Sequence, residues 1–588
     1  MSTIAKSSRR LARLGFAAAG LLATTAMVQA ADVAFDRLVN PEPENWLSYG
    51  RTYDSHRFSP LDEINTDNVA GLRVSHMLPL ALPEAGGFAI SSLHATPLVD
   101  NGTMYMVDGW GRVYGIDLTA GDRAFIRWVM DPQTPRETDG ITNNRGVALL
   151  GNTIYSIGLD GYLFGTDATT GELMWAVPTE RNPVEYFTMA PLAIDGKVIM
   201  GPAGGDGPMR GRLEARDAAN GDPVWTFYTI PGPGEPGSET WVIPETAEIG
   251  GGAVWATGSY DVNQNLVVWG IGNPQPDWDP TLRPGDNLYT DSTVALNADT
   301  GELVWYFQYT PNDSWDYDEV GTQLLYEVDG RATLAHFGRN GFFYQLDAIT
   351  GEFINGGQYV EQLTWSEGLD PKTGKPVEYD PNLDVQIYRG AGELLELPGF
   401  GGAPQMMPDR NLNFCPYWEG GVNFYPTSYS ELTGYAYGSA MEGCNDFATG
   451  FAGFGQVGGV TGDTPLTGSV TAVDSATGTV VARHSMPYIG RAGVLTTAGG
   501  LVFSASLNGD FFALDDETME VLWNFNTGTG IEAPPISFAV NGKQYIALPV
   551  GPGGVGADFH RYAEHGDDPN ASAMANANPA AIMLFFSL

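Results

Sequence analysis

Asp167-Ala168-Thr169-Thr170-Gly171, with Trp175 four residues further on, is one copy of a turn that recurs along this chain. A short run rich in Val, Ile, Phe and Tyr precedes each copy and predicts a strand. Asp, Thr and Gly supply the tight turn that joins one strand to the next. The other copies are residues 117–121, 217–221, 297–301, 347–351, 430–434, 474–478 and a degenerate copy at 515–519.

Eight turns, mostly about 40 to 50 residues apart, predict four-stranded blades. The predicted fold class is therefore all-β, an eight-bladed β-propeller, in which the recurring tryptophans stack blade on blade. Two longer intervals predict loop insertions at 226–290 and 356–425, where Pro and Gly cluster. The alternative of two missed blades is less favoured, because neither insertion contains a second turn. Residues 46–61 are expected to supply the outer strand that closes the ring, and the tail from residue 551 is expected to be irregular.

Residues 1–30 have the pattern of an export signal. Arg9, Arg10 and Arg13 precede a short apolar run at 14–26, and a small-residue cleavage pattern ends near Ala30. The run is too short for a stable membrane span, and no later run is long enough. We therefore predict a periplasmic or secreted protein in which residues 31–588 form a single propeller domain, with the Sec and twin-arginine routes both open.

The overall charge excludes some classes of partner. The chain has 29 basic and 70 acidic residues, a formal net charge of −41. This charge argues against binding to nucleic acid or to anionic membrane surfaces, and it suits a basic protein partner or a saline habitat equally well. The only two cysteines, Cys415 and Cys444, predict one disulfide in an exported protein. A Cys-x-x-Cys-His haem attachment sequence is absent.

Acidic and amide side chains in three stretches point to a cation site. Asp316 and Asp318 lie one residue apart and would project from the same face of an extended backbone. Asp206 and Asn273 lie in glycine-rich stretches that we expect to converge on them. Carboxylate and amide oxygens are the ligands that a hard cation prefers. The alternative for Asp316 and Asp318 is a solvated acidic loop.

Several short motifs resemble those of the pyrroloquinoline quinone (PQQ)-dependent alcohol dehydrogenases, the methanol and ethanol dehydrogenase group of quinoproteins. The resemblance covers nearly the whole mature chain and implies an eight-bladed propeller with tryptophan-docking repeats and a quinone buried on its axis. The motifs, in family order, are residues 49–61, Gly250-Gly251-Gly252-Ala253-Val254-Trp255, Gly270-Ile271-Gly272-Asn273-Pro274, Arg283-Pro284-Gly285-Asp286-Asn287 and Trp315-Asp316-Tyr317-Asp318.

The resemblance implies roles for individual residues. Asp316 matches the catalytic base, and Arg339 matches the cation beside the reactive carbonyl of the quinone. Asp206 and Asn273 match positions that bind the metal ion. The quinone contacts implied are Trp255 as the stacking surface, Arg145 near the carboxylates, Asn423, and Thr188 as a further contact.

Three departures from the family pattern concern the same site. Asp139-Gly140 occupies the place where the family has two adjacent cysteines that cover the quinone. The usual metal-binding Glu is replaced by the shorter Asp206. His94 stands where a Glu or Gln contacts the quinone, and we interpret it either as a hydrogen-bonding substitute or as a packed loop histidine.

The function implied by the resemblance is oxidation of an alcohol to an aldehyde or ketone by hydride transfer to PQQ. Because no haem sequence occurs, we expect a separate soluble cytochrome c to accept the electrons, and a homodimer is compatible with the sequence. An alternative within enzymes is a polyol or polymeric alcohol substrate admitted by the insertion at 356–425. The alternative outside enzymes is a non-enzymatic propeller scaffold of the cell envelope, in which Asp316, Asp318, Asn273 and Arg339 need not meet.

The metal ion is predicted from Asp318. In the family, an acid at this position resembles the lanthanide-using members, whereas calcium users tend to have a small residue. Asp206, Asp316 and Asp318 would place three carboxylates around one ion, a charge that a trivalent cation balances better than a divalent one. We therefore predict a lanthanide(III) ion, with Ca²⁺ as the alternative; the shorter Asp206, or a pairing of Asp318 with a nearby arginine, would count against the lanthanide.

Overall fold

The computed structural model describes residues 32–80, 93–135, 143–277, 279–389, 394–395, 405–406, 412–447, 466–551 and 581–588. The predicted signal peptide and Asp139-Gly140 lie outside these residues. Within them, the only α-helix is α1 (Phe35–Val39), and four short 3-10 helices occur: η1 (Val69–Gly71), η2 (Ser238–Thr240), η3 (Pro244–Ile249) and η4 (Pro280–Leu282). No helix among the described residues is long and apolar enough to cross a membrane.

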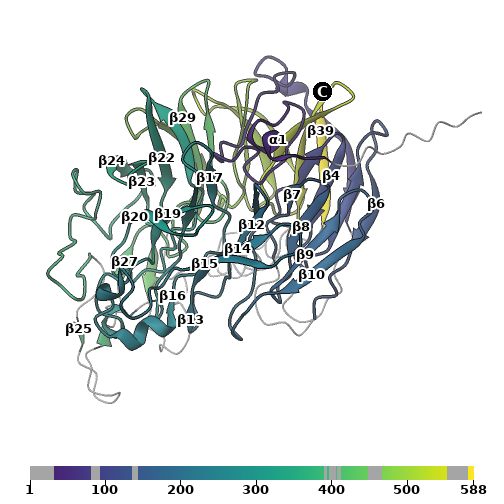
Figure 1. Cartoon of the computed structure of the whole chain (residues 1–588). Helices are drawn as coiled ribbons and strands as arrows, with labels where there is room; N and C mark the ends of the chain where they lie inside the picture. The colour runs from purple at the N-terminus through teal and green to yellow at the C-terminus, as the bar shows by residue number, and fades with distance from the viewer. Residues whose placement is uncertain are drawn as a thin grey trace, which may run out of the picture.

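Eight antiparallel sheets form the blades and confirm the predicted all-β propeller (Figure 1). The first four are β3 (Leu98–Asp100), β4 (Thr103–Val107), β5 (Val113–Asp117), β6 (Phe125–Met130); β7 (Ala148–Leu150), β8 (Thr153–Ile157), β9 (Tyr162–Asp167), β10 (Leu173–Pro178); β11 (Leu192–Ile194), β12 (Lys197–Met200), β14 (Arg212–Asp217), β15 (Pro223–Tyr228); and β17 (Ser259–Asp261), β18 (Leu266–Gly270), β19 (Ser292–Asn297), β20 (Leu303–Gln308).

The next three blades are β21 (Leu324–Val328), β22 (Arg331–Phe337), β23 (Phe342–Asp347), β24 (Phe353–Gln358); β28 (Ser428–Ser430), β29 (Tyr435–Glu442), β31 (Thr467–Asp474), β32 (Thr479–Met486); and β33 (Leu495–Thr497), β34 (Leu501–Ala505), β35 (Asp510–Asp515), β36 (Val521–Asn526), which β1 (Phe58–Ser59) extends. The eighth is β37 (Ile536–Val540), β38 (Lys543–Val550), β39 (Ile582–Ser587) and β2 (Arg73–Pro79). Short pairs are β13 (Met209–Arg210) with β16 (Gly250–Gly251), β25 (Leu394–Leu395) with β26 (Gln405–Met406), and β27 (Leu412–Phe414) with β30 (Asn445–Phe447).

The recurring tryptophans dock one blade against the next, as predicted. Trp305, on the outer strand β20, is only 6% exposed, and its Nε1 donates to the carbonyl oxygen of Ala348 in the turn of the following blade at 3.1 Å. The ring also covers Gly351 of that turn, where an added Cβ would lie 2.6 Å from the indole. Gly351 has φ +73°, so glycine suits both the turn and the close ring. The repeat therefore encodes the blade–blade interface as well as the hairpin.

The count of eight blades is correct, but the assumption that each blade contains one such turn is wrong. Seven of the turns join the third strand of a blade to the outer strand, whereas the turn at 430–434 joins β28 to β29 in the blade that also contains the turn at 474–478. The blade of β37, β38, β39 and β2 has no such turn among the described residues. A Thr-Gly turn reports a tight hairpin and not its place within a blade.

Ring closure also differs from the prediction. The outer strand of the closing blade is β2, not residues 46–61, and it pairs with β39 at the carboxyl end of the chain. From residues 46–61, β1 instead pairs in parallel with the innermost strand β33. Figure 1 shows β39, in yellow, among the purple and blue amino-terminal strands. The end of the tail is therefore a buried strand, because its apolar run Ile582-Met583-Leu584-Phe585-Phe586 fills the closing blade.

The predicted insertion at 226–290 contains two strands of a blade. β17 and β18 divide it, so the inserted segments are 229–258 and 271–291. The insertion at 356–425 does lie between blades, and residues 390–393, 396–404 and 407–411 of it lie outside the described residues. The predicted disulfide between Cys415 and Cys444 is present and joins the end of this insertion to the segment after β29.

Candidate active site

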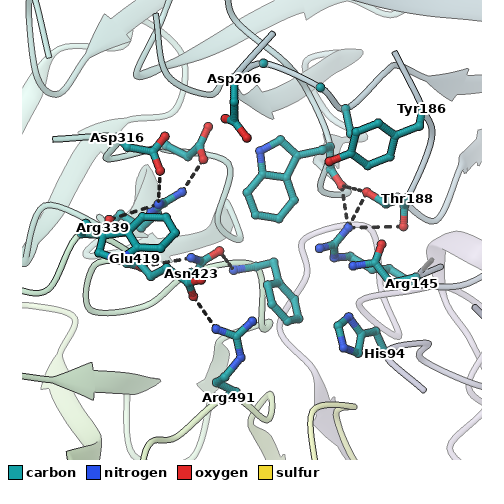
Figure 2. Close-up of a pocket in the computed structure, with 18 residues that line it drawn as sticks. His94, Arg145, Tyr186, Thr188, Asp206, Asp316, Arg339, Glu419, Asn423 and Arg491 are labelled. Carbon is teal, nitrogen blue, oxygen red and sulfur yellow. Dashed lines mark hydrogen bonds and ion pairs between the residues drawn. The ribbon is translucent and has the colours of Figure 1, made fainter. Parts of the chain in front are cut away.

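A cavity of about 150 Å³ lies where the innermost strands of the blades converge. Most of its lining residues come shortly before an innermost strand: His94 before β3, Arg145 before β7, Thr188 before β11, Trp255 before β17 and Arg491 before β33. Because innermost strands surround the centre of a propeller, the cavity lies on its axis. Figure 2 shows Asp206 and Asp316 at one end and His94 and Arg145 at the other.

Three carboxylates cluster at the acidic end. Ligand oxygens of Asp206, Asp277 and Asp316 all lie within 4.8 Å of one another. Asp316 stands in the loop between β20 and β21 with φ +60°, a left-handed conformation that aspartate tolerates better than most residues. Sequence reasoning missed Asp277, although its position four residues after Asn273 was an available signal.

Asp318 makes different contacts from Asp316. Its Oδ1 accepts a hydrogen bond from the backbone N–H of Asn273 at 2.8 Å, and its Oδ2 pairs with the Arg339 guanidinium. The same guanidinium lies 3.2 Å from Asp316 Oδ2. The structure thus brings Asp316, Asp318, Asn273 and Arg339 together, as predicted for an axial site, and Asp318 has the arginine partner named above as its alternative.

Asp316 has few donors to stabilise its charge. Asp316 is 7% exposed, and its Oδ1 has no hydrogen-bond partner among the described residues. Burial, opposed by Arg339 and reinforced by Asp318, Asp206 and Asp277, raises the pKa of Asp316 well above its usual range. Asp206 is exposed as a residue, yet the protein around its carboxylate and the nearby Asp318 charge raise its pKa to about 6. A bound cation would lower these pKa values and keep the carboxylates ionised.

The opposite end is cationic and aromatic. Arg145 Nη1 donates to Thr188 Oγ1 at 2.5 Å and to the Trp255 carbonyl oxygen at 3.2 Å. The Arg145 guanidinium lies 4.7 Å from the centre of the Trp255 ring, and its buried Nε has no partner among the described residues. Asn143 Oδ1 is likewise buried without a described partner. These groups can hold a flat anionic molecule over an indole face.

His94 is hydrogen-bonded to a buried group of ion pairs that the sequence did not reveal. Its Nε2 lies 3.0 Å from Glu532 Oε2, and its ring stacks on Phe424 with centroids 5.0 Å apart. Glu532 also pairs with Arg491, which pairs in turn with Glu419. Burial lowers the pKa of His94, opposed by Glu532. The histidine therefore both packs in the wall and faces the cavity.

Asn423 lies in the same wall. Its Nδ2 donates to the Glu419 carbonyl oxygen at 3.0 Å, and its Oδ1 accepts from the backbone N–H of Phe424 at 2.7 Å. These two bonds fix the amide against its own loop at the edge of the cavity. Arg491 and Glu419 also line the cavity and were not among the predicted residues.

Arg283 holds together the two loops that carry the acids. The side chain is fully buried, with an exposed fraction of 0%. Its guanidinium donates to the carbonyl oxygens of Pro276 and Asp277 at 3.0 Å each, and also to that of Asp313. Asp313 Oδ2 in turn accepts from the backbone N–H groups of Trp315 and Tyr317. These backbone contacts position Asp277 and Asp316 without occupying their carboxylates.

Fold and cavity together define a propeller able to enclose a flat anionic group and a cation on its axis. The family described as glucose/ethanol/alcohol dehydrogenase, β-propeller domain, with PQQ as its cofactor, matches residues 46–359 and 466–546. The chain belongs to this family, the PQQ-dependent quinoprotein alcohol dehydrogenases.

Individual relatives agree with this family. Quinohemoprotein alcohol dehydrogenase ADH-IIG of Pseudomonas putida is 34% identical over 88% of this chain and 74% of its own length. Quinoprotein alcohol dehydrogenase PedH, also of Pseudomonas putida, is 33% identical over 87% of both chains. The solved structure of a europium-containing methanol dehydrogenase superposes with a TM-score of 0.78 at 28% identity, covering 94% of this chain and all of that chain. These relatives favour the dehydrogenase over the envelope scaffold.

The residues present fit the quinone and metal ion of this family. Nε of Arg145 and Nε of Arg339 have no partner in the part of the chain that the structure describes, and with the partly exposed Trp255 they suit a flat anionic ligand. Asp206, Asp277 and Asp316, one of them with an unpartnered buried oxygen, suit a cation rich in oxygen ligands.

Proposed function

We propose that this chain oxidises an alcohol to an aldehyde or ketone, with Asp316 as the general base and PQQ as the acceptor. The observation that carries the proposal is the buried Oδ1 of Asp316, which has no hydrogen-bond partner within the described part of the chain and lies beside Arg339 at one end of an aromatic cavity. A base must have a free oxygen within reach of the proton that it takes, and Asp316 offers that oxygen.

The side chains of the cavity have separate tasks. Trp255 provides the surface on which the quinone stacks, while Arg145 and Thr188 bind its charged edge, with Asn423 and His94 as further contacts. Bound PQQ supplies a two-electron acceptor that this chain's own side chains lack. Asp316 accepts the hydroxyl proton of the alcohol at Oδ1, and Arg339 stabilises negative charge that develops beside it.

The metal ion that we propose is a lanthanide(III), held by Asp206, Asn273 and Asp316, with Asp318 as a nearby negative charge whose two oxygens already contact the Asn273 N–H and Arg339. Four carboxylates, counting Asp277, surround this end, and Arg339 offsets only one of their charges. A trivalent cation balances the remainder better than Ca²⁺ does. The ion also lowers the pKa of Asp316, so that the base stays ionised in a buried site. Refilling metal-stripped protein with PQQ plus either La³⁺ or Ca²⁺ distinguishes the two ions, because full turnover with Ca²⁺ alone would contradict the lanthanide.

We further propose a periplasmic location and a separate soluble cytochrome c as electron acceptor. The formal charge of −41 supports an encounter with a basic partner. Attraction between exposed charges weakens with salt, so the rate of cytochrome reduction should fall as ionic strength rises. An electron-transfer rate unaffected by salt would indicate an uncharged docking surface or another acceptor.

Reconstitution tests the central proposal. Apoprotein incubated with PQQ and metal, then freed of excess ligand, should retain one quinone per chain by absorbance and should reduce a dye when ethanol is added. Absence of bound quinone would contradict the proposal. Bound quinone without oxidation of simple alcohols would favour the polyol or polymeric substrate, which the same assay can test with glycerol and longer polyols.

A further inference from the structure

We propose that Asp277 is itself a ligand of the metal ion, supplying a carboxylate oxygen alongside Asp206, Asn273 and Asp316. The inference rests on the proposed metal-dependent function and extends it to a residue that neither the motifs nor the family resemblance singled out. Asp277 is only 5% exposed, and its carboxylate oxygen lies within 4.8 Å of ligand oxygens of both Asp206 and Asp316.

The contacts of the neighbouring acid favour this assignment. Asp318 accepts from the Asn273 backbone N–H with one oxygen and pairs with Arg339 through the other. Both oxygens of Asp318 are therefore engaged by the protein. Asp316, in contrast, meets Arg339 through Oδ2 alone, at 3.2 Å, and its ligand oxygen lies within 4.8 Å of ligand oxygens of Asp206 and Asp277. The three carboxylates best placed to share one cation are therefore those of Asp206, Asp277 and Asp316.

Asp277 also orients the amide ligand. Asn273 Nδ2 donates to Asp277 Oδ1 at 2.7 Å, which directs the amide nitrogen toward the acid. The amide oxygen of Asn273 then faces Gly205, the residue before Asp206. A Cβ added to Gly205 would lie 3.1 Å from that oxygen. An amide must present its oxygen and not its nitrogen to a cation, so this bond places Asn273 correctly. Asp277 could therefore act in two ways that experiment can separate: by binding the ion directly and by orienting Asn273.

The experiment uses Eu³⁺ as a probe of the site in the full chain. Its luminescence lifetime in H₂O and D₂O counts the water molecules bound to the ion, and titration gives the affinity without any assay of turnover. Asp277→Asn should weaken Eu³⁺ binding by at least about 10-fold, the lower end seen even for groups that only support a ligand. It should also add about one bound water, because an open position on such an ion is filled by solvent.

Asp279→Asn is the matched control. Asp279 lies two residues away on the same loop, where its side chain accepts from Thr281 N–H and caps η4. The change removes the same charge without touching the cluster, so Eu³⁺ affinity and water count should stay near those of the wild type. If Asp277→Asn reduces soluble yield, Asp277→Ser replaces it, since a hydroxyl still accepts from Asn273.

A double-mutant cycle separates the two roles of Asp277. If Asp277 is a ligand, Asp277→Asn weakens Eu³⁺ binding further in an Asn273→Ala background. If Asp277 acts only by orienting Asn273, it has no further effect there, and that result would overturn the proposal. Equal affinity and water count in Asp277→Asn and wild type would also overturn it while leaving the proposed function intact. Failure of the wild type to bind Eu³⁺ at all would contradict the metal-dependent function itself.

Discussion

Aspartates in the ring of turns and aspartates on the axis are in opposite chemical environments. In the turn at 167–171, Asp167 Oδ1 accepts hydrogen bonds from the backbone N–H groups of Thr169 and Thr170. In the equivalent turn, slight burial of Asp347 is outweighed by hydrogen bonds from Arg331 and the backbone, and the pKa falls below its usual value. Burial raises the pKa of Asp316 on the axis despite Arg339. Asp167 and Asp347 are satisfied by the fold, whereas Asp316 keeps an oxygen that a ligand can use.

The supporting contacts differ in the same way. In the ring, the carboxylate itself makes the bonds that shape the turn. On the axis, the Arg283 guanidinium and the Asp313 carboxylate hold the loop backbones through hydrogen bonds. The carboxylates of Asp277 and Asp316 are therefore less important for the shape of these loops. An identical substitution should therefore cost stability in one region and activity in the other.

The largest expected effect is loss of turnover in Asp316→Asn. Removal of a positioned base should lower the rate of alcohol oxidation by about 10²–10⁴-fold. Bound quinone should remain, because shape and most hydrogen bonds are kept. Asp167→Asn is the matched change in a turn and should leave the rate unaltered. Dye-linked kinetics on quinone-loaded protein make the comparison, and near wild-type turnover in Asp316→Asn would refute the assignment.

The next effect is on the blade interface. Trp305→Ala removes a ring packed on Gly351 and should lower stability by about 3–5 kcal/mol. The adjacent Val304 is 52% exposed, so Val304→Ala should change stability by less than about 0.5 kcal/mol. Urea denaturation followed by fluorescence measures both. Similar small losses in the two variants would show that the docking tryptophans do not hold the ring together.

Loss of the disulfide should lower the free energy of unfolding by a comparable or slightly smaller amount. Cys415 and Cys444 close a loop with a sequence separation of 29, and a bridge of this span contributes about 3 kcal/mol by restricting the unfolded chain. The bridged segment also contacts the axial loop, since Tyr317 Oη donates to the Pro416 carbonyl oxygen at 2.8 Å. Replacing both cysteines by serine should lower the urea midpoint, and a reducing agent should then have no further effect. Two free thiols by mass spectrometry in the native protein would contradict the bridge.

The repeat made the propeller predictable because its turn chemistry is local. Asp, Thr and Gly at fixed positions favour a hairpin wherever they occur, and this explains both the correct count of blades and the misplaced turn at 430–434. Ring closure depends instead on a pairing between β2 and β39, which are separated by almost the whole chain. Nothing local in residues 73–79 identifies that distant partner.

The site was predictable in part for a related reason. Asp316, Asp318, Asn273 and Arg339 lie in short motifs, and the structure brings them together. Asp277 and the Glu532–Arg491 pair lie in no such motif, and only the three-dimensional arrangement reveals them. That Asp318 pairs with Arg339 depends on side-chain geometry that spacing alone does not define.

The smallest expected effect concerns Asp516, a turn residue in an environment resembling the axis. It is only 7% exposed, and burial together with the charges of Asp515 and Glu517 raises its pKa to about 6. Its backbone N–H donates to the Gly500 carbonyl oxygen, and its carbonyl oxygen accepts from Tyr437 Oη, bonds that an asparagine would retain.

The sign of the pH dependence follows from that raised pKa. Below about pH 4 the carboxyl is protonated in both the folded and the unfolded chain, so its burial does not lower the free energy of unfolding. As the pH rises through about 6, the unfolded chain has already lost the proton that the folded chain still holds, so the contribution of Asp516 to stability is progressively lost. Asp516→Asn should therefore match the wild type near pH 4 and exceed its stability at pH 7 by on the order of 1 kcal/mol. Asp515→Ala is the contrasting neighbour: Asp515 Oδ1 accepts from the backbone N–H groups of Glu517 and Thr518, so removal of this acceptor should destabilise the turn by about 1 kcal/mol. Urea midpoints at pH 4.5 and 7.5 measure both variants. An equal gain in stability for Asp516→Asn at the two pH values would show that burial of charge does not cause the gain. A gain in both variants would contradict the distinction between satisfied and unsatisfied acids within one turn.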